Sequence, residues 1–156
     1  MEINNNFDAP FGPLPALRLQ YVPRWVIVNM DRKQSVAEHS FNVALIVKYI
    51  YEAKFKGSYN VEVMNSMMIE ALFHDGDEIY TGDIPSPAKE HIHYDTASLI
   101  KLADMIESYR HAMLHCRDTK AIKTFVTVKL YQKITDFAVA ICIGYEIIKP
   151  LLDEVK

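Results

Sequence analysis

Apolar residues recur at three- and four-residue spacing along almost the whole chain, and this pattern limits the fold more narrowly than any other feature. Glycine is scarce, with 5 residues, and no Asn-Gly or Asp-Gly turn lies between alternating strands. A repeat near 3.6 residues suits helices that bury one face, whereas strands need a repeat of two. We therefore expect an all-α domain, a helical bundle of about five main helices.

Capping residues and helix breakers indicate where these helices begin and end. Ser35 has the capping-box spacing to an acidic residue three positions later, and Asn60 can cap the next helix. Pro23 stops the first helix, and Pro150 is expected to end the last one. A loop with glycine and two prolines, Tyr80 to Lys89, precedes the fourth helix. The expected helices are approximately 14–21, 36–53, 61–74, 94–116 and 120–149.

Size, charge and cysteine content narrow the possible functions. A chain of 156 residues suits one domain, which we expect to span 1–156. The formal net charge of −3 argues against binding a nucleic-acid polymer, because phosphate backbones attract a basic excess. With only 2 cysteines, neither a disulfide framework nor a cysteine zinc site is expected. The N-terminus lacks signal-peptide features and no apolar run could span a membrane, so we expect a cytoplasmic protein without membrane contact.

Histidine and carboxylate side chains remain as candidate metal ligands. His39 lies inside the second expected helix, and adjacent His74 and Asp75 lie at the end of the third. Imidazole nitrogen and carboxylate oxygen are common ligands of Zn, Mn, Co and Fe. A lone helical histidine or a single His-Asp pair is more often structural. The combination of the pair with His39, Glu78 and the acidic, proline-bearing loop favours a metal site.

Four short segments follow one another in a characteristic order. They are Arg24-Trp25, Ser35-Val36-Ala37-Glu38-His39-Ser40, His74-Asp75-Gly76-Asp77-Glu78 and Thr81-Gly82-Asp83-Ile84-Pro85-Ser86-Pro87-Ala88-Lys89. This series resembles the motifs of the HD-domain metal-dependent phosphohydrolases. It is most similar to the bacterial 5′-deoxynucleotidases and to their compact phage relatives, the dATP triphosphohydrolases. The resemblance covers about residues 24–89 and implies an HD-domain fold with a divalent ion, Zn, Co, Mn or Mg.

The resemblance also implies a set of metal ligands, namely His39, His74, Asp75 and an aspartate from a late helix. We favour Asp136 as this aspartate, because a mid-helix carboxylate among apolar neighbours is costly to bury unless it is paired or bound to metal. Asp104 is the alternative. Its local context is at least as similar to the family, but it follows closely after the loop.

The same resemblance gives roles to two further carboxylates. Glu78 would orient or deprotonate the attacking water, and Asp83 would hold the nucleotide sugar or a leaving oxygen. Without these roles, Glu78 would be a solvated acid at a helix end and Asp83 a turn residue.

Four residues are candidates for contact with the substrate. Arg24 and Lys89 are the best phosphate ligands, although either could be a solvated surface cation. Trp25 could stack on a base or a deoxyribose, although a sole tryptophan more often lies in the core. Ile27 would face the same way as Trp25 in an extended segment and could press on the edge of the base.

The function that we expect first is hydrolysis of dATP, or of dNTPs more widely, to deoxynucleoside and triphosphate. The alternative is a 5′-deoxynucleotidase that releases phosphate from dNMPs. A degenerate HD domain that only binds nucleotide is a further alternative. A phosphodiesterase acting on a cyclic nucleotide is disfavoured because such enzymes lack the string 81–89. The resemblance implies a homo-oligomer, a dimer or a hexamer, and a phage-encoded enzyme would act in the host cytoplasm.

Overall fold

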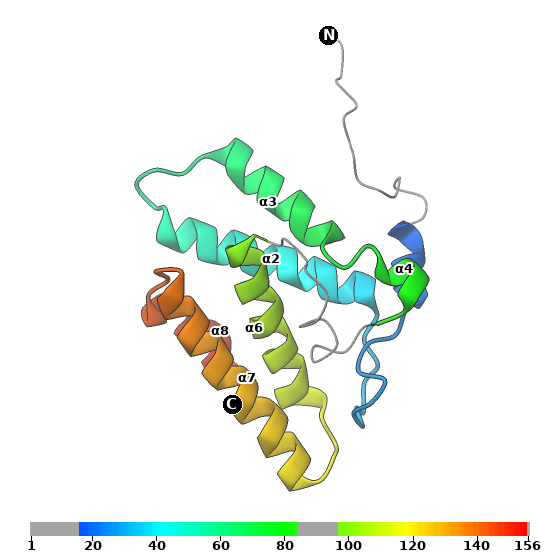
Figure 1. Ribbon diagram of the computed structural model, residues 1–156. Coiled ribbons are helices and arrows are strands. Elements are labelled where there is room, and N and C mark those ends of the chain that lie inside the picture. Colours follow the sequence, from blue (N-terminus) through cyan, green and yellow to red (C-terminus); the bar gives the residue numbers. More distant parts are fainter. Residues whose placement is uncertain (1–15, 84–96, 156) are drawn as a thin grey trace.

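The fold is helical, as the apolar spacing predicts, and helices make up most of the part of the chain that the structure describes. A computed structural model describes residues 16–83 and 97–155 (Figure 1). Within these ranges there is no strand, and only two isolated β-bridges occur. The described residues form five longer helices and two short ones: η1 Leu17–Tyr21, α2 Val36–Lys54, α3 Val61–Phe73, α4 Glu78–Thr81, α6 Ser98–His115, α7 Lys120–Ala140 and α8 Tyr145–Asp153.

Helix α2 is the centre of the bundle and begins where the sequence predicts. The Ser35 side chain accepts a hydrogen bond from the Glu38 N–H, which satisfies a donor of the first turn. Helix α2 contacts both α3 and α6, and α7 packs on α6 (Figure 1). Its fully buried residues include Val43, Val47 and Ile50, which join the hydrophobic core.

Helix α3 runs back along α2, so that its C-terminal end lies near the N-terminal end of α2 (Figure 1). Asn60 caps α3 by accepting hydrogen bonds from the N–H groups of Glu62 and Val63, as expected. The antiparallel pairing brings the residues after Phe73 close to the first turns of α2. This proximity is what places the two predicted histidine motifs together.

The last expected helix, 120–149, is in fact two helices. Helix α7 ends at Ala140, and Cys142 follows with a left-handed backbone (φ 58°). The Ile143 N–H donates to Ala138 O (2.8 Å) and the Cys142 N–H to Val139 O (3.1 Å), the hydrogen bonds of a Schellman motif. Pro150 was expected to end the last helix, but it lies inside α8.

The first expected helix, 14–21, is also revised. Among the described residues it is a 3-10 helix, Leu17–Tyr21, which buries Leu19. None of the helices described is both long and apolar enough to cross a membrane.

Candidate metal centre

Three helices supply the side chains of the candidate site. His39 lies in the first turns of α2, where the Ser35 cap sets the start of the helix, and it is completely buried. His74 is the C-cap of α3, and Asp75 follows it into a turn closed by the Gly76 N–H on Phe73 O (2.9 Å). Because α3 ends here, the side chains of both His74 and Asp75 can approach α2.

The structure brings these side chains together with Asp104 of α6. His39, His74 and Asp104 each offer one ligand atom, and these atoms all lie within 4.8 Å of one another. His39 Nε2 is 3.1 Å from Asp104 Oδ1 and 3.6 Å from Asp75 Oδ2. His74 Nε2 is 3.3 Å from Asp75 Oδ2. Two imidazoles and two carboxylates thus converge on one small region.

The outer ring nitrogens show how the two histidines are oriented. His74 Nδ1 donates to Ala71 O (2.7 Å), and His39 Nδ1 lies 2.6 Å from Glu107 Oε2. A histidine whose Nδ1–H is donated keeps the Nε2 lone pair for a metal, and this arrangement is typical of metal-binding histidines. Both Nε2 atoms are buried and make no hydrogen bond within the described residues. The residues present therefore fit a divalent ion of the kind that binds nitrogen and oxygen.

The fourth ligand expected from the sequence, Asp136, does not lie at this site. It is exposed on α7 and accepts a hydrogen bond from the exposed Gln132 (2.9 Å), one turn earlier. Helix α7 packs on α6, whereas α6 packs directly on α2. Among the described residues, the structure groups the alternative, Asp104, with His39 and His74, and Asp104 is therefore the ligand proposed below.

The charges of the site differ from residue to residue. Burial lowers the pKa of His74 below its ordinary value, which favours the neutral imidazole. Burial also opposes a charge on His39, but the nearby carboxylates of Asp104 and Glu107 outweigh it and raise the pKa of His39. Burial would raise the pKa of Asp104, yet the nearby His39, His74 and Arg24 side chains hold it well below its usual range. The site therefore contains the Asp104 carboxylate and the neutral His74 imidazole, and a cation between these two groups would be stabilised.

Arg24 links the metal-site cluster to the loop after α4. Its side chain is only 10% exposed, and Nε lies 3.6 Å from Asp83 Oδ1. Nη2 lies 3.9 Å from Asp104 Oδ1. The structure thus brings Arg24 and Asp83, two of the residues singled out in the sequence, to the edge of the site.

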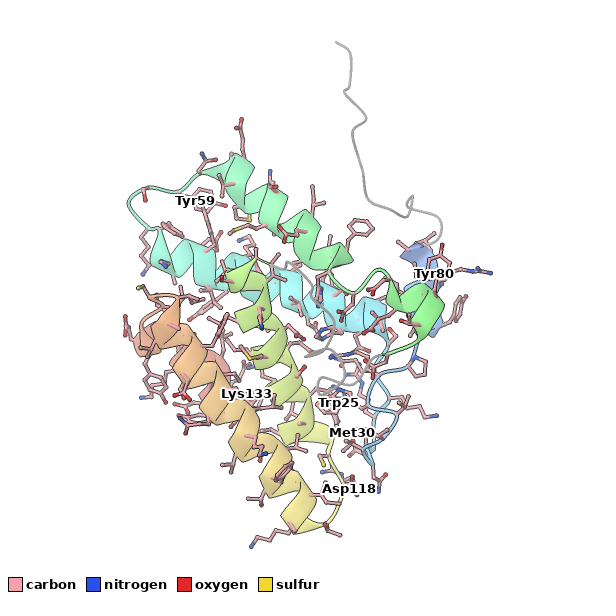
Figure 2. The ribbon with its side chains drawn as sticks, in the orientation of Figure 1. Trp25, Met30, Tyr59, Tyr80, Asp118 and Lys133 are labelled. Atoms are coloured by element: carbon pink, nitrogen blue, oxygen red, sulfur yellow. The ribbon has the colours of Figure 1, made fainter. Side chains whose placement is uncertain are left out.

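Trp25 lies next to Arg24, in the segment between η1 and α2 (Figure 2). Its backbone is left-handed (φ 61°), which a bulky residue rarely adopts, and its N–H donates to Asp83 Oδ2 (3.2 Å). The indole stacks on the His111 ring at 6.0 Å between centroids. Such strain often occurs at functional sites, where neighbouring contacts maintain it.

The other predicted site residues have different surroundings. Glu78 is completely buried in the first turn of α4, so it is not the solvated acid of the alternative interpretation. Gly82 ends α4 with φ 72°, a conformation that favours glycine, and leads directly to Asp83. Ile27 is 74% exposed in this chain. Lys89 lies outside the described residues.

Two buried polar residues of the site were not found from the sequence. Glu107, one turn after Asp104 on α6, and Gln34, just before the cap of α2, are 4% and 1% exposed. Gln34 Nε2 donates to Glu107 Oε1 (2.5 Å). The three-residue spacing that places Glu107 on the same face of α6 as Asp104 was a signal in the sequence, and it depended on choosing Asp104.

Comparison with known proteins agrees with this geometry. A family model described as "5'-deoxynucleotidase YfbR-like" matches residues 15–114. The chain is 33% identical over 130 residues to a protein of Salmonella phage PMBT28 named dATP triphosphohydrolase, covering 80% of this chain and 61% of that protein. It is 36% identical over 77 residues to a 5′-deoxynucleotidase of Yersinia pestis (strain Pestoides F), covering 47% of this chain and 38% of that protein. The chain thus spans less than two thirds of the length of these relatives.

A solved structure has a similar fold. The HD phosphohydrolase DatZ of cyanophage S-2L, bound to dA and one catalytic Zn²⁺ ion, superposes with a TM-score of 0.65. The match covers 93% of this chain and 94% of that chain at 20% sequence identity. At this identity the likeness establishes the fold alone, which agrees with the HD-domain bundle expected from the motifs.

Proposed function

The chain belongs to the YfbR-like 5′-deoxynucleotidase family, and from this premise we propose that it is a metal-dependent deoxynucleotide phosphohydrolase. The observation that carries the proposal is the convergence of the His39 and His74 Nε2 atoms with the carboxylate of Asp104. Both nitrogens are buried without a hydrogen bond within the described residues, which is costly unless a cation binds there. His39, His74, Asp75 and Asp104 are the proposed metal ligands.

A divalent ion held by these side chains supplies a Lewis acid, which makes water a stronger nucleophile and offsets negative charge on the phosphoryl group. Glu78 is the proposed proton acceptor for the attacking water. Glu78 is completely buried and its N–H donates to Asp75 O (3.1 Å), so it lies within one turn of a proposed metal ligand, which supports this role.

Arg24 is the proposed phosphate ligand of the described chain. Its Nε atom is buried without a hydrogen bond among the described residues, so it can donate to a phosphoryl oxygen. Asp83 lies 3.6 Å from this atom and also accepts from the Trp25 N–H, which supports a role in holding Arg24 and Trp25 for the substrate. Lys89 remains a second proposed phosphate ligand, and Ile27 a proposed contact of the base.

The first proposed substrate is dATP, with release of deoxyadenosine and triphosphate. Support comes from the phage dATP triphosphohydrolase, whose similarity covers 80% of this chain, and from the dA bound to DatZ. The alternative, release of phosphate from dNMPs, is supported by the family match and by the Yersinia 5′-deoxynucleotidase, whose similarity covers 47% of this chain.

Three wider expectations also remain proposals. The chain is proposed to act as one HD domain over 1–156, as a homo-oligomer, and in the cytoplasm of a host cell. Exposed Phe41, Leu45 and Tyr49 follow one another at four-residue spacing along α2 and support association through an apolar face.

A substrate panel tests the proposed function. Each dNMP and dNTP is incubated with the protein and Zn, Co, Mn or Mg, and chromatography separates phosphate from triphosphate. We expect deoxyadenosine and intact triphosphate from dATP, and no product with His74→Ala. Turnover of dNMPs alone would favour the 5′-deoxynucleotidase, and metal and nucleotide binding without any product would favour the degenerate domain.

A further inference from the structure

Glu107 of α6 has an unusually complete set of hydrogen-bond donors around its carboxylate. Oε2 lies 2.6 Å from His39 Nδ1 and accepts from Arg24 Nη1 at 3.3 Å. Oε1 accepts from Gln34 Nε2 at 2.5 Å and from Asn42 Nδ2 at 3.2 Å. Its side chain is 5% exposed. The four donors come from α2 and from the segment that precedes it.

This environment restricts what Glu107 can do. A carboxylate offers about four acceptor positions, and here four donors occupy them. Glu107 therefore has no lone pair left for a metal ion, a substrate hydroxyl or a proton from water. Any effect of Glu107 on a reaction must pass through the groups that it holds.

We propose that Glu107 is a positioning residue that orients the metal ligand His39 and the phosphate ligand Arg24 together. The inference rests on the proposed function, because it takes His39 and Arg24 as functional groups. It goes beyond that function by assigning the link between the metal site and the phosphate site to one carboxylate on α6.

The contact with His39 explains the metal side of this link. An ionised Glu107 accepts hydrogen bonds and cannot donate one. His39 Nδ1 therefore carries the hydrogen, and Nε2 keeps its lone pair. The negative charge of the Glu107 carboxylate beside Nδ1 also makes Nε2 a stronger metal ligand. Without Glu107, the imidazole could place its hydrogen on Nε2 instead, where it would donate to Asp104 and block the metal.

The contact with Arg24 explains the substrate side. Gln34 Oε1 also accepts from Arg24 Nη1 (3.3 Å), and the Arg24 N–H donates to Gln34 O (2.8 Å). Glu107 and Gln34 therefore fix one edge of the guanidinium from behind. The Nε atom of the Arg24 guanidinium faces Asp83, with 3.6 Å between Nε and Asp83 Oδ1.

The test compares Glu107→Gln and Glu107→Met with Glu52→Gln as a matched control. Glu52 is a partly exposed carboxylate of α2 that pairs with Lys48, so its substitution removes the same charge away from the site. Zinc affinity is measured by competition with a chelator, without nucleotide. We expect the zinc dissociation constant to rise about 10- to 100-fold in Glu107→Gln and further in Glu107→Met. Glu52→Gln should match the unchanged protein.

Two further readouts separate positioning from simple structural support. At saturating zinc, the KM for dATP should remain raised in both Glu107 variants because Arg24 is no longer held. In the metal-free protein, above the pKa of His39, nitrogen NMR should show the His39 hydrogen on Nδ1 in the unchanged protein. The same spectrum should show a shift toward Nε2 in Glu107→Met.

If circular dichroism shows that the Glu107 variants have lost their helices, Gln34→Met replaces them, and its zinc affinity is compared with those of Glu52→Gln and the unchanged protein. It removes a donor from Glu107 and leaves the carboxylate, so a smaller loss of zinc affinity in the same direction is expected. Equal zinc affinity and an equal KM in the folded variants and in the unchanged protein would overturn the role of Glu107 alone. Failure of the unchanged protein to bind zinc would overturn the proposed function as well.

Discussion

At the scale of single residues, the two histidines of the site are held by different partners, and their pKa values shift in opposite directions. His39 faces Glu107 and Asp104, which raise its pKa against the effect of burial, whereas burial lowers the pKa of His74. Metal binding must therefore displace a proton from His39 when that ring is charged. His74, which donates Nδ1–H to a backbone carbonyl, is already in the form that binds metal.

Replacement of His74 by alanine should remove the metal and leave the fold. Loss of an outer-shell partner alone weakens metal binding by about 10- to 100-fold, so loss of a ligand should weaken it by more than about 100-fold. Elemental analysis after gel filtration measures the bound metal, and circular dichroism measures the helices. Full metal occupancy in a folded His74→Ala protein would contradict the ligand assignment.

The choice between the two aspartates gives a matched pair of variants. Asp104→Asn should lower metal affinity by more than about 100-fold on the same argument. Asp136→Asn should leave it unchanged, because Asp136 is exposed on α7 and bonded to Gln132. Titration of both variants with zinc measures these affinities. A loss of zinc affinity in Asp136→Asn and not in Asp104→Asn would identify Asp136 as the ligand instead.

The residues that the sequence identified were those whose chemistry is local. The pair of His74 and Asp75 is adjacent in the chain, and Ser35 places His39 at a fixed point of a capped helix. The fourth ligand depended on which later helix packs against α2, and apolar spacing alone does not determine helix pairing. Glu107 was missed for the same reason, since its partners are all distant in sequence.

At the scale of elements, the site depends on helix ends rather than on helix interiors. His39 lies just after the cap of α2, and His74 and Asp75 lie where α3 stops. Both N-caps were predictable because Ser35 and Asn60 are characteristic capping residues. The end of α7 was not, because its Schellman motif has Cys142 at the left-handed position that glycine usually occupies.

Substitution of Cys142 by glycine should therefore stabilise the protein. A non-glycine residue at φ 58° is strained, and glycine relieves that strain at a position where the side chain is exposed. We expect a gain of up to about 1 kcal/mol in the free energy of unfolding, measured with urea. Ala140→Gly, in the last turn of α7, is the control and should be destabilising by a similar amount. A loss of stability in Cys142→Gly would contradict the strain argument.

At the scale of the whole molecule, the candidate metal centre joins elements from both halves of the chain. Its ligands come from the first turns of α2, from the end of α3 and from α6. The helical class and most helix positions followed from apolar periodicity, whereas this meeting point follows from packing. A metal bound there would tie the three helices together.

Removal of metal should consequently lower the stability of the whole fold. Free ligand at about 100 times its dissociation constant adds about 2.7 kcal/mol to the folded state. A chelator should lower the Tm of the zinc-loaded protein, and added zinc should restore it. The Tm of His74→Ala should not respond to either, and an equal response of both proteins would place the stabilising metal elsewhere.

Anomalous X-ray diffraction at the zinc edge from crystals of the zinc-loaded protein tests the central claim most directly. We predict one strong peak in each chain within about 2.0–2.2 Å of the Nε2 atoms of His39 and His74 and a carboxylate oxygen of Asp104. A peak at other residues, or none between α2, α3 and α6 in crystals that contain zinc, would contradict the account.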